Sequence, residues 1–168
     1  MKFQFAAPLE AAQSKLFNWQ LRVPEEVTAA LLASPTKRRV VCVLNGQDPH
    51  QCALTPIGQG TYVIKVNQGR IKKLALAEGQ EVQLELFPDD SKYGLPMPPE
   101  MEAALAEDPE GNSLFHALSP GKLRTMLYVV GQGTNTDNRL WRAVQILEHL
   151  KLRAGKINYK ELYHDLRL

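Results

Sequence analysis

The sequence predicts an α+β protein: a small closed antiparallel β-barrel of the split type, with pseudo-twofold symmetry, followed by a C-terminal helical segment. Three observations support this prediction. A proline-rich stretch divides the chain, strand patterns and a weak internal repeat precede it, and helical periodicity follows it. Two similar halves that close one barrel remove the exposed edges of a sheet.

The dividing stretch is PDDSKYGLPMPP, residues 88–99, which contains four prolines. Proline interrupts both helices and strand ladders, so a boundary is expected here. We predict a β-barrel domain at residues 1–90, a proline-rich linker at 91–99 and a helical domain at 100–168. A chain of 168 residues can bury enough surface without a metal or disulfide staple.

Four segments of the first part carry strand signals. RRVVCVLNG is rich in β-branched residues and ends in the turn-forming pair Asn45-Gly46. EGQEVQLELF alternates strictly and places Val82, Leu84 and Leu86 on one face. The other two segments are QCALTP and GQGTYVIKVNQG.

The internal repeat aligns WQLRVPEEVTAALLASPTKRRVVCVL with YVIKVNQGRIKKLALAEGQEVQLEL. Each copy reads as a strand ending in valine, a short helix-like stretch, a turn and a second strand. The interval from Val23 to Val40 is 17 positions, and that from Val66 to Val82 is 16. This pattern has two possible origins: two related halves of one barrel, or a chance similarity between two strand–helix–strand units.

The second part reads as helices. PPEMEAALAED begins with proline and glutamate, and Pro109 and Gly111 are expected to end it. Ser113 is expected to cap a short turn, and Ser119-Pro120 to begin the next helix. The buried face of that helix follows the i, i+3, i+4, i+7 rule and comprises Leu123, Met126, Leu127 and Val130.

The segment Gly131-Gln132-Gly133 raises the question of a phosphate-binding loop. A dinucleotide loop requires a third glycine where Thr136 stands, and SPGKL lacks the other residues of a Walker loop. We therefore predict that Gly131 or Gly133 ends a helix in the left-handed conformation. Thr134, Asn135 or Thr136 can cap the next helix.

That next helix, at about residues 137–152, has an apolar arc with Arg139 inside it. A buried guanidinium needs a carboxylate, carbonyl groups or a bound anion. Arg139 either reaches solvent or pairs with an acid such as Asp89 or Asp90, or it forms a recessed site for an anionic ligand or acidic protein partner. The candidate binding residues are Arg139, Arg142, Lys122 and Arg124, and the expected apolar arc is Leu140, Ala143, Val144, Ile146, Leu147 and Leu150.

The two cysteines, Cys42 and Cys52, lie in strand-like runs joined by NGQDPH. A hairpin centred on Gln47 would place them opposite each other, where a disulfide or thiol switch is conceivable. In a cytosolic chain, two small buried residues are favoured. A zinc site with His50 would need a fourth ligand that the sequence does not place, so we assign no metal and no cofactor.

Catalytic motifs are absent from the sequence. It has no nucleophile elbow, no zinc-protease motif and no paired Cys-x-x-Cys, and its four histidines stand apart. We expect a non-enzymatic binding protein, with a small-molecule enzyme as an alternative. No run approaches the length of a membrane span and the start does not resemble a signal peptide, so the cytoplasm is the expected location.

The net charge of +2 is unevenly distributed, with −3 over residues 1–111 and +5 over residues 112–168. A basic C-terminal third could favour an acidic partner, although a solvated helix surface is the simpler explanation. Nucleic acid is possible but not favoured, because phosphate neutralisation requires clustered cations. The only tight basic cluster in the first part is TKRR, residues 36–39.

The order and spacing of several segments resemble the bacterial bacteriocin-protection family, also called YdeI- or OmpD-associated proteins. These segments are WQLRVPEEV, VVCVLNG, LTPIGQGTYVIKV and EGQEVQLEL, then LPMPPEMEAALAEDPEGNSLFHALSPGKLRTMLYVV and NRLWRAVQILEHL. Members with this layout join an N-terminal β domain of unknown function to a helical segment.

The resemblance implies a small closed barrel similar to the split barrels of AbrB-type transcription factors, which keeps a DNA- or RNA-binding regulator as an alternative. It also implies a link to tolerance of bacteriocins or stress, without a defined reaction. Arg139 and Arg142 match the family pattern. The lysine that usually follows the preceding helix is replaced here by Gly131 to Gly133.

Overall fold

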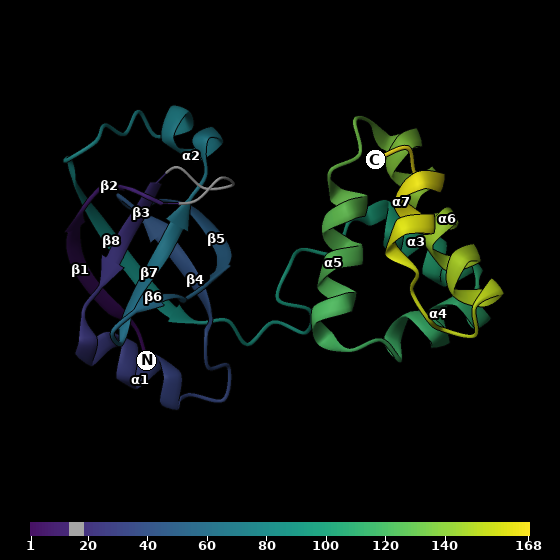
Figure 1. Cartoon of the computed structure of the whole chain (residues 1–168), viewed down its shortest axis with the longest axis horizontal. Helices are drawn as coiled ribbons and strands as arrows, with labels where there is room; N and C mark the ends of the chain where they lie inside the picture. The colour runs from purple at the N-terminus through teal and green to yellow at the C-terminus, as the bar shows by residue number, and fades with distance from the viewer. Residues whose placement is uncertain (14–18) are drawn as a thin grey trace. The chain divides into compact units, whose positions relative to one another are not determined.

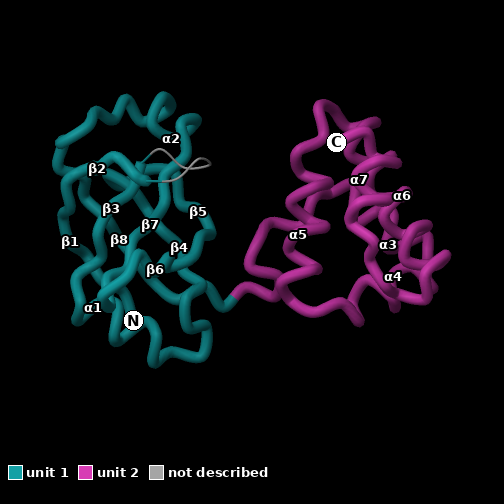
Figure 2. The backbone as a smooth tube through the Cα atoms, in the orientation of Figure 1, with its two compact units in different colours: residues 1–90 teal, residues 91–168 magenta. Residues whose placement is uncertain are grey.

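A computed structural model describes residues 1–13 and 19–168 of the chain. The chain divides into two compact units, Met1–Asp90 and Ser91–Leu168 (Figure 2). Each unit has its own hydrophobic core. The proline-rich segment 91–99 is part of the second unit, because Tyr93, Leu95 and Met97 pack against the core of that unit.

Within residues 1–13 and 19–90, the first unit contains two four-stranded antiparallel sheets and two short helices (Figure 1). The first sheet has the order β1 (Phe3–Pro8), β8 (Glu81–Pro88), β4 (Arg39–Leu44) and β5 (Gln47–Ala53). The second sheet has the order β2 (Glu10–Ala11), β3 (Trp19–Val23), β7 (Thr61–Val66) and β6 (Thr55–Gly58). The helices are α1 (Glu25–Ala33) and α2 (Gln68–Lys73).

The prediction of a closed barrel is wrong. Across residues 1–13 and 19–90 neither sheet closes, and each keeps two edge strands. The chain passes between the sheets at Leu9 and Leu54, which are both buried. Their amides donate to loop carbonyls, Leu9 N to Gln80 O at 2.9 Å and Leu54 N to Arg38 O at 2.8 Å. Because these amides bond to loops, the ladder does not continue from one sheet into the other.

The two copies of the sequence repeat fold as β3–α1–β4 and β7–α2–β8. β3 pairs with β7 in the second sheet, and β4 pairs with β8 in the first. One core joins both sheets, with Leu31 from α1 and Ile71 from α2. On β8 the alternation expected from the sequence is present, with Val82, Leu84 and Leu86 all buried.

A two-residue turn joins β4 to β5. Asn45 and Gly46 have φ values of 49° and 70°, and positive φ at both central residues is what a type I′ hairpin turn requires. The side-chain oxygen of Asn45 accepts the backbone N–H of Gln83 at 2.9 Å, which ties the turn to β8.

The register of this hairpin differs from the expectation. Cys42 lies opposite His50, and Cys52 lies opposite Val40. The hairpin is therefore not centred on Gln47, and the cysteines are diagonal neighbours rather than a facing pair. The turn at residues 45–46 and a register shift just before it move the partners. Both cysteines are free thiols.

The second unit is helical. Its elements are α3 (Pro99–Glu107), α4 (Pro109–His116), α5 (Pro120–Gly131), α6 (Thr136–Leu152) and α7 (Tyr159–Asp165). Phe115 of α4 is completely buried in its core. Among the residues that the structure describes, no helix has the length and apolar character needed to cross a membrane.

The connection between α3 and α4 differs from the expectation. Pro109 begins α4 instead of ending the preceding helix. The Asp108 side chain caps α4 by accepting the N–H of Gly111 at 2.8 Å. Ser113 consequently lies within the helix rather than at its start. Proline suits the first helical position because its missing N–H has no partner there in any case.

The connection from α5 to α6 also corrects a prediction. Neither Gly131 nor Gly133 has a positive φ, and the C-cap residue Gln132 has φ −79°. The expected left-handed helix end is therefore wrong. Asn135, one of the three candidates, is the N-cap of α6, and its side chain accepts the N–H of Asn138 at 2.8 Å.

The buried face of α6 is broader and differently placed than its apolar arc indicates. Leu140 and Val144 are 40% and 41% exposed, whereas Arg142 and His149 are buried. α6 contacts α3, α4, α5 and α7, so its buried surface extends around the helix. The members of the expected arc that are buried are Ala143, Ile146, Leu147 and Leu150.

Candidate functional site

A pocket of about 450 Å³ lies within the helical unit. It is bordered by the proline-rich segment, the start of α3, the end of α5 and the start of α6. Its volume is in the range of pockets that hold small molecules. Its lining residues are Leu95, Pro96, Met97, Pro98, Pro99, Glu100, Leu127, Tyr128, Gly131, Gln132 and Arg139.

Most of the pocket wall is apolar. Prolines and Met97 form one side, and residues of α5 form another. Leu127 is buried, whereas Tyr128 is 59% exposed. An exposed aromatic ring beside prolines offers an apolar surface for a ligand to cover.

Arg139 is the cationic group of the pocket. Its Nε and Nη2 atoms are each 2.8 Å from Oε1 of Glu100. Nη2 also donates to the Thr136 hydroxyl at 3.3 Å, and Nη1 donates to the Gly133 carbonyl at 3.4 Å. The last distance exceeds the usual range for an N–H···O bond, so Nη1 is weakly satisfied.

Glu100 balances the positive charge of Arg139. Its side chain is 9% exposed, and the hydrogen bond from Arg139 holds its pKa below the usual 4.5. Oε2 of Glu100 is buried and has no hydrogen-bond partner within the described part of the chain. The ion pair therefore uses one carboxylate oxygen and leaves the other without a donor.

Gly133 permits the approach of Arg139. A Cβ atom at this position would lie 2.4 Å from Cγ of Arg139 and 3.0 Å from its Cα atom. Real side chains do not tolerate such contacts, so a larger residue would displace the start of α6. Glycine is needed here for close packing and not for an unusual φ angle.

The structure brings only one of the four predicted binding residues to the pocket. Arg142 is buried on α6, and its Nη1 donates to the Val129 carbonyl at 2.8 Å. Lys122 is exposed and Arg124 is half-buried, both near the start of α5. The pocket borders the end of this helix, and nine residues of helix separate Lys122 from Gly131 by about 14 Å.

Sequence patterns do not identify the pocket residues Glu100 and Tyr128. Glu100 is only a glutamate at the start of a helix, and no motif distinguishes Tyr128. The predicted partners of Arg139 were Asp89 and Asp90, which belong to the first unit. An unpaired arginine in an apolar arc indicated that some acid is nearby, but Glu100 is 39 positions away and only the packing of α3 beside α6 selects it.

The comparisons with known families cover most of the chain. Residues 5–86 match the family described as Domain of unknown function (DUF1905). Residues 95–152 match the family described as Bacteriocin-protection, YdeI or OmpD-Associated, and this range includes all residues that line the pocket. The search of curated proteins found no match. The two family matches confirm the resemblance inferred from the sequence. Residues 95–152 therefore belong to the bacteriocin-protection (YdeI or OmpD-associated) family, and the residues before them, 5–86, belong to the DUF1905 family.

Proposed function

We propose that this chain is a non-enzymatic binding protein that takes a small molecule into the pocket of its helical unit, and that this binding underlies a role in bacteriocin or stress tolerance. The observation that carries this function is an open apolar pocket with a weakly satisfied guanidinium donor in its wall. The cytoplasm is the compartment we propose, on the basis of the ordinary globular composition.

The pocket chemistry defines the ligand class. The prolines, Met97 and Tyr128 suit an apolar body. Nη1 of Arg139 suits a hydrogen-bond acceptor, and the weak 3.4 Å bond to Gly133 is easily exchanged for a better one. Because Glu100 already neutralises Arg139, a neutral head group such as an amide fits as well as a carboxylate. An ammonium head group has no lone pair with which to accept the hydrogen bond of Nη1, so it does not fit this position.

A nucleic-acid regulator has less support. Arg142 is buried and Arg139 is paired with Glu100, so two of the four candidate cations are used inside the helical unit. Phosphate binding depends on cations that are free to replace counterions. The small ligand is therefore the stronger candidate.

Three probes with one apolar body test the ligand class: octanoate, octanamide and octylammonium. We expect the first two to raise the melting temperature of the purified chain and the third to have no effect. Tyr128→Ala should weaken binding of both probes by about tenfold, because it removes an exposed part of the wall. Trp141→Ala is the matched control, since Trp141 is exposed on α6 and does not line the pocket.

A cellular experiment links the pocket to tolerance. Cells that express the wild-type chain, Tyr128→Ala or Trp141→Ala would be challenged with a bacteriocin, and survival would be counted. Survival should fall only for Tyr128→Ala. Equal binding and equal survival for the two variants would show that this pocket is not the working site.

A further inference from the structure

A separate cluster of side chains lies in the first unit, where Cys42 on β4 meets His50 and Cys52 on β5. The two sulfurs and one imidazole nitrogen all lie within 4.8 Å of one another. Cys42 is fully buried, whereas His50 and Cys52 are half-buried. Because β5 is an edge strand, the cluster has one side in the core and another toward the edge of the sheet.

The tautomer of His50 follows from one contact. Its Nδ1 atom is 2.8 Å from the carbonyl oxygen of Asp48. A carbonyl can only accept, so Nδ1 carries the proton and donates it. The neutral ring then keeps its lone pair on Nε2. Histidines that bind metal ions characteristically donate their other ring N–H to a carbonyl or carboxylate, so His50 is prepared in the form of a metal ligand.

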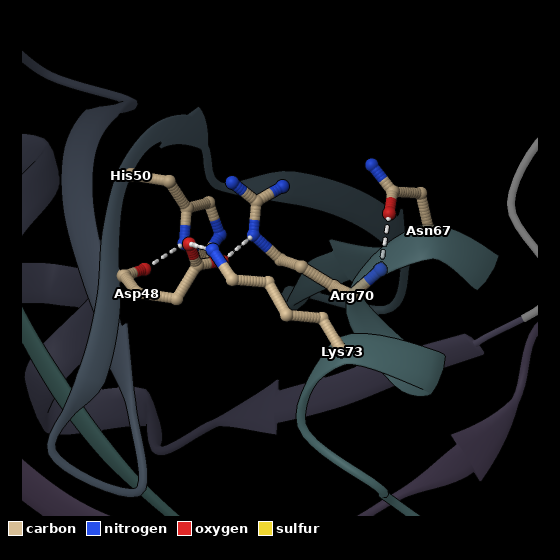
Figure 3. Close-up of polar contacts among 5 residues, drawn as sticks. All are labelled: Asp48, His50, Asn67, Arg70 and Lys73. Carbon is tan, nitrogen blue, oxygen red and sulfur yellow. Dashed lines mark hydrogen bonds and ion pairs between the residues drawn. The ribbon is translucent and has the colours of Figure 1, made fainter.

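Asp48, which orients His50, is itself fixed from two sides. Its carboxylate binds Nε of Arg70 and Nζ of Lys73, both from α2 and both at 2.6 Å (Figure 3). The start of α2 is capped by Asn67, whose side chain accepts the N–H of Arg70 at 2.8 Å (Figure 3). Asp48 has φ +52°, a left-handed conformation that aspartate adopts more readily than most residues other than glycine.

We propose that Cys42, His50 and Cys52 bind a zinc ion and leave one coordination position to water or to a small external ligand. Two cysteine sulfurs and an imidazole are a donor set that zinc prefers. Two thiolates balance the charge of Zn²⁺, whereas monovalent copper would leave a net negative charge beside the core.

The number of ligands fits an open site. In the part of the chain that the structure describes, the group has three members, and no further histidine, cysteine or carboxylate supplies a fourth ligand. Both carboxylate oxygens of Asp48 already bind cations. Structural zinc sites use four protein ligands, and sites with three leave the fourth position accessible.

The distances require little rearrangement. Ligand atoms around tetrahedral zinc are separated by roughly 3.5–3.8 Å, given the usual zinc–sulfur and zinc–nitrogen bond lengths. Separations of up to 4.8 Å must therefore shorten by about 1.3 Å at most. His50 and Cys52 can supply this movement because they are half-buried on an edge strand.

The test uses the reduced full chain, freed of metal by a chelator and titrated with Zn²⁺ in competition with a chromophoric chelator. We expect one zinc ion per chain. Cys52→Ser and His50→Asn should each weaken zinc binding by at least about tenfold. His164→Asn is the matched control, because His164 lies on an exposed part of α7. Zinc should also protect both thiols of the wild-type chain from alkylation.

Three results would overturn the assignment. One is a wild-type chain that binds no more zinc than the Cys42→Ala/Cys52→Ala double variant. Another is unchanged alkylation of the thiols when zinc is present. The third is binding of monovalent copper with no binding of zinc. Circular dichroism would check that each variant folds. If the loss of Cys42 from the core prevents folding, Cys52→Ser and His50→Asn on the edge strand β5 still test the assignment.

Discussion

Arg139 and Glu100 are joined through a single carboxylate oxygen, with Nε and Nη2 of the guanidinium both 2.8 Å from Oε1. This contact connects the first turn of α6 to the first turn of α3. We expect Glu100→Gln to lower the stability of the helical unit, because it removes the anionic partner of a partly buried cation. Glu102→Gln, an exposed change in the same turn, should have little effect.

The effect of Glu100→Gln should depend on pH. Because Arg139 holds the folded-state pKa of Glu100 below its usual 4.5, the stabilisation is present above about that pH and is lost as pH falls through the lowered value. The difference from wild type in denaturant titrations should therefore be larger at about pH 7 than at about pH 3. An equal difference at both values would contradict the role of the charge.

Gly133→Ala should destabilise the start of α6. The added Cβ would lie 2.4 Å from Cγ of Arg139, and two backbone atoms of Arg139 are only 3.0 Å away, so the chain must shift. Gly121→Ala provides the control, because a Cβ there meets nothing within 4 Å and alanine favours a helix by about 0.5–1 kcal/mol. Opposite changes in melting temperature are expected, and equal changes would disprove the steric account.

His149 should make the helical unit sensitive to acid. Its side chain is buried, Nε2 accepts the N–H of Asn158 at 3.1 Å, and burial followed by the charge of Arg153 lowers its pKa below 6.5, while Asp165 partly opposes this. The unfolded chain therefore binds a proton more readily than the folded chain. The stabilisation that depends on neutral His149 is therefore present above about pH 6.5 and is lost as the pH falls below that value.

Denaturant midpoints between about pH 5 and pH 8 would measure this dependence. His149→Gln should flatten the curve, because glutamine does not titrate and can still accept the N–H of Asn158. His164→Gln, on the exposed side of α7, should leave the wild-type slope. A slope that persists unchanged in His149→Gln would assign the dependence to other groups.

The two cores should respond separately to truncation. Phe115 is fully buried in the helical unit, and Leu21 is fully buried in the β unit. Phe115→Ala should cost about 3–5 kcal/mol and Leu21→Ala about 2–5 kcal/mol. Hydrogen exchange should show faster opening of the core amides in the unit that carries the change. Equal acceleration in both units would mean that the chain unfolds as one cooperative block.

Much of the local structure could be predicted because it depends on neighbouring residues. The alternation of Val82, Leu84 and Leu86 indicates a half-buried strand, and Asn45-Gly46 indicates a tight hairpin turn. Capping also acts over three or four residues, so Asn135 was among the residues expected to begin α6. In each case the sequence alone determines the outcome, because the interacting groups are close along the chain.

Tertiary structure decided whatever depends on distant partners. Whether the two sheets join depends on which carbonyl groups accept the backbone N–H groups of Leu9 and Leu54. The acceptor for Leu9 is Gln80, far along the chain, and the acceptor for Leu54 is Arg38, before the β4–β5 hairpin. The partner of Arg139 is an acid 39 positions away, selected by helix packing. The approach of His50 to Cys42 depends on a register shift in the hairpin. Such contacts are chosen by the packing of whole elements, which periodicity along the sequence does not encode.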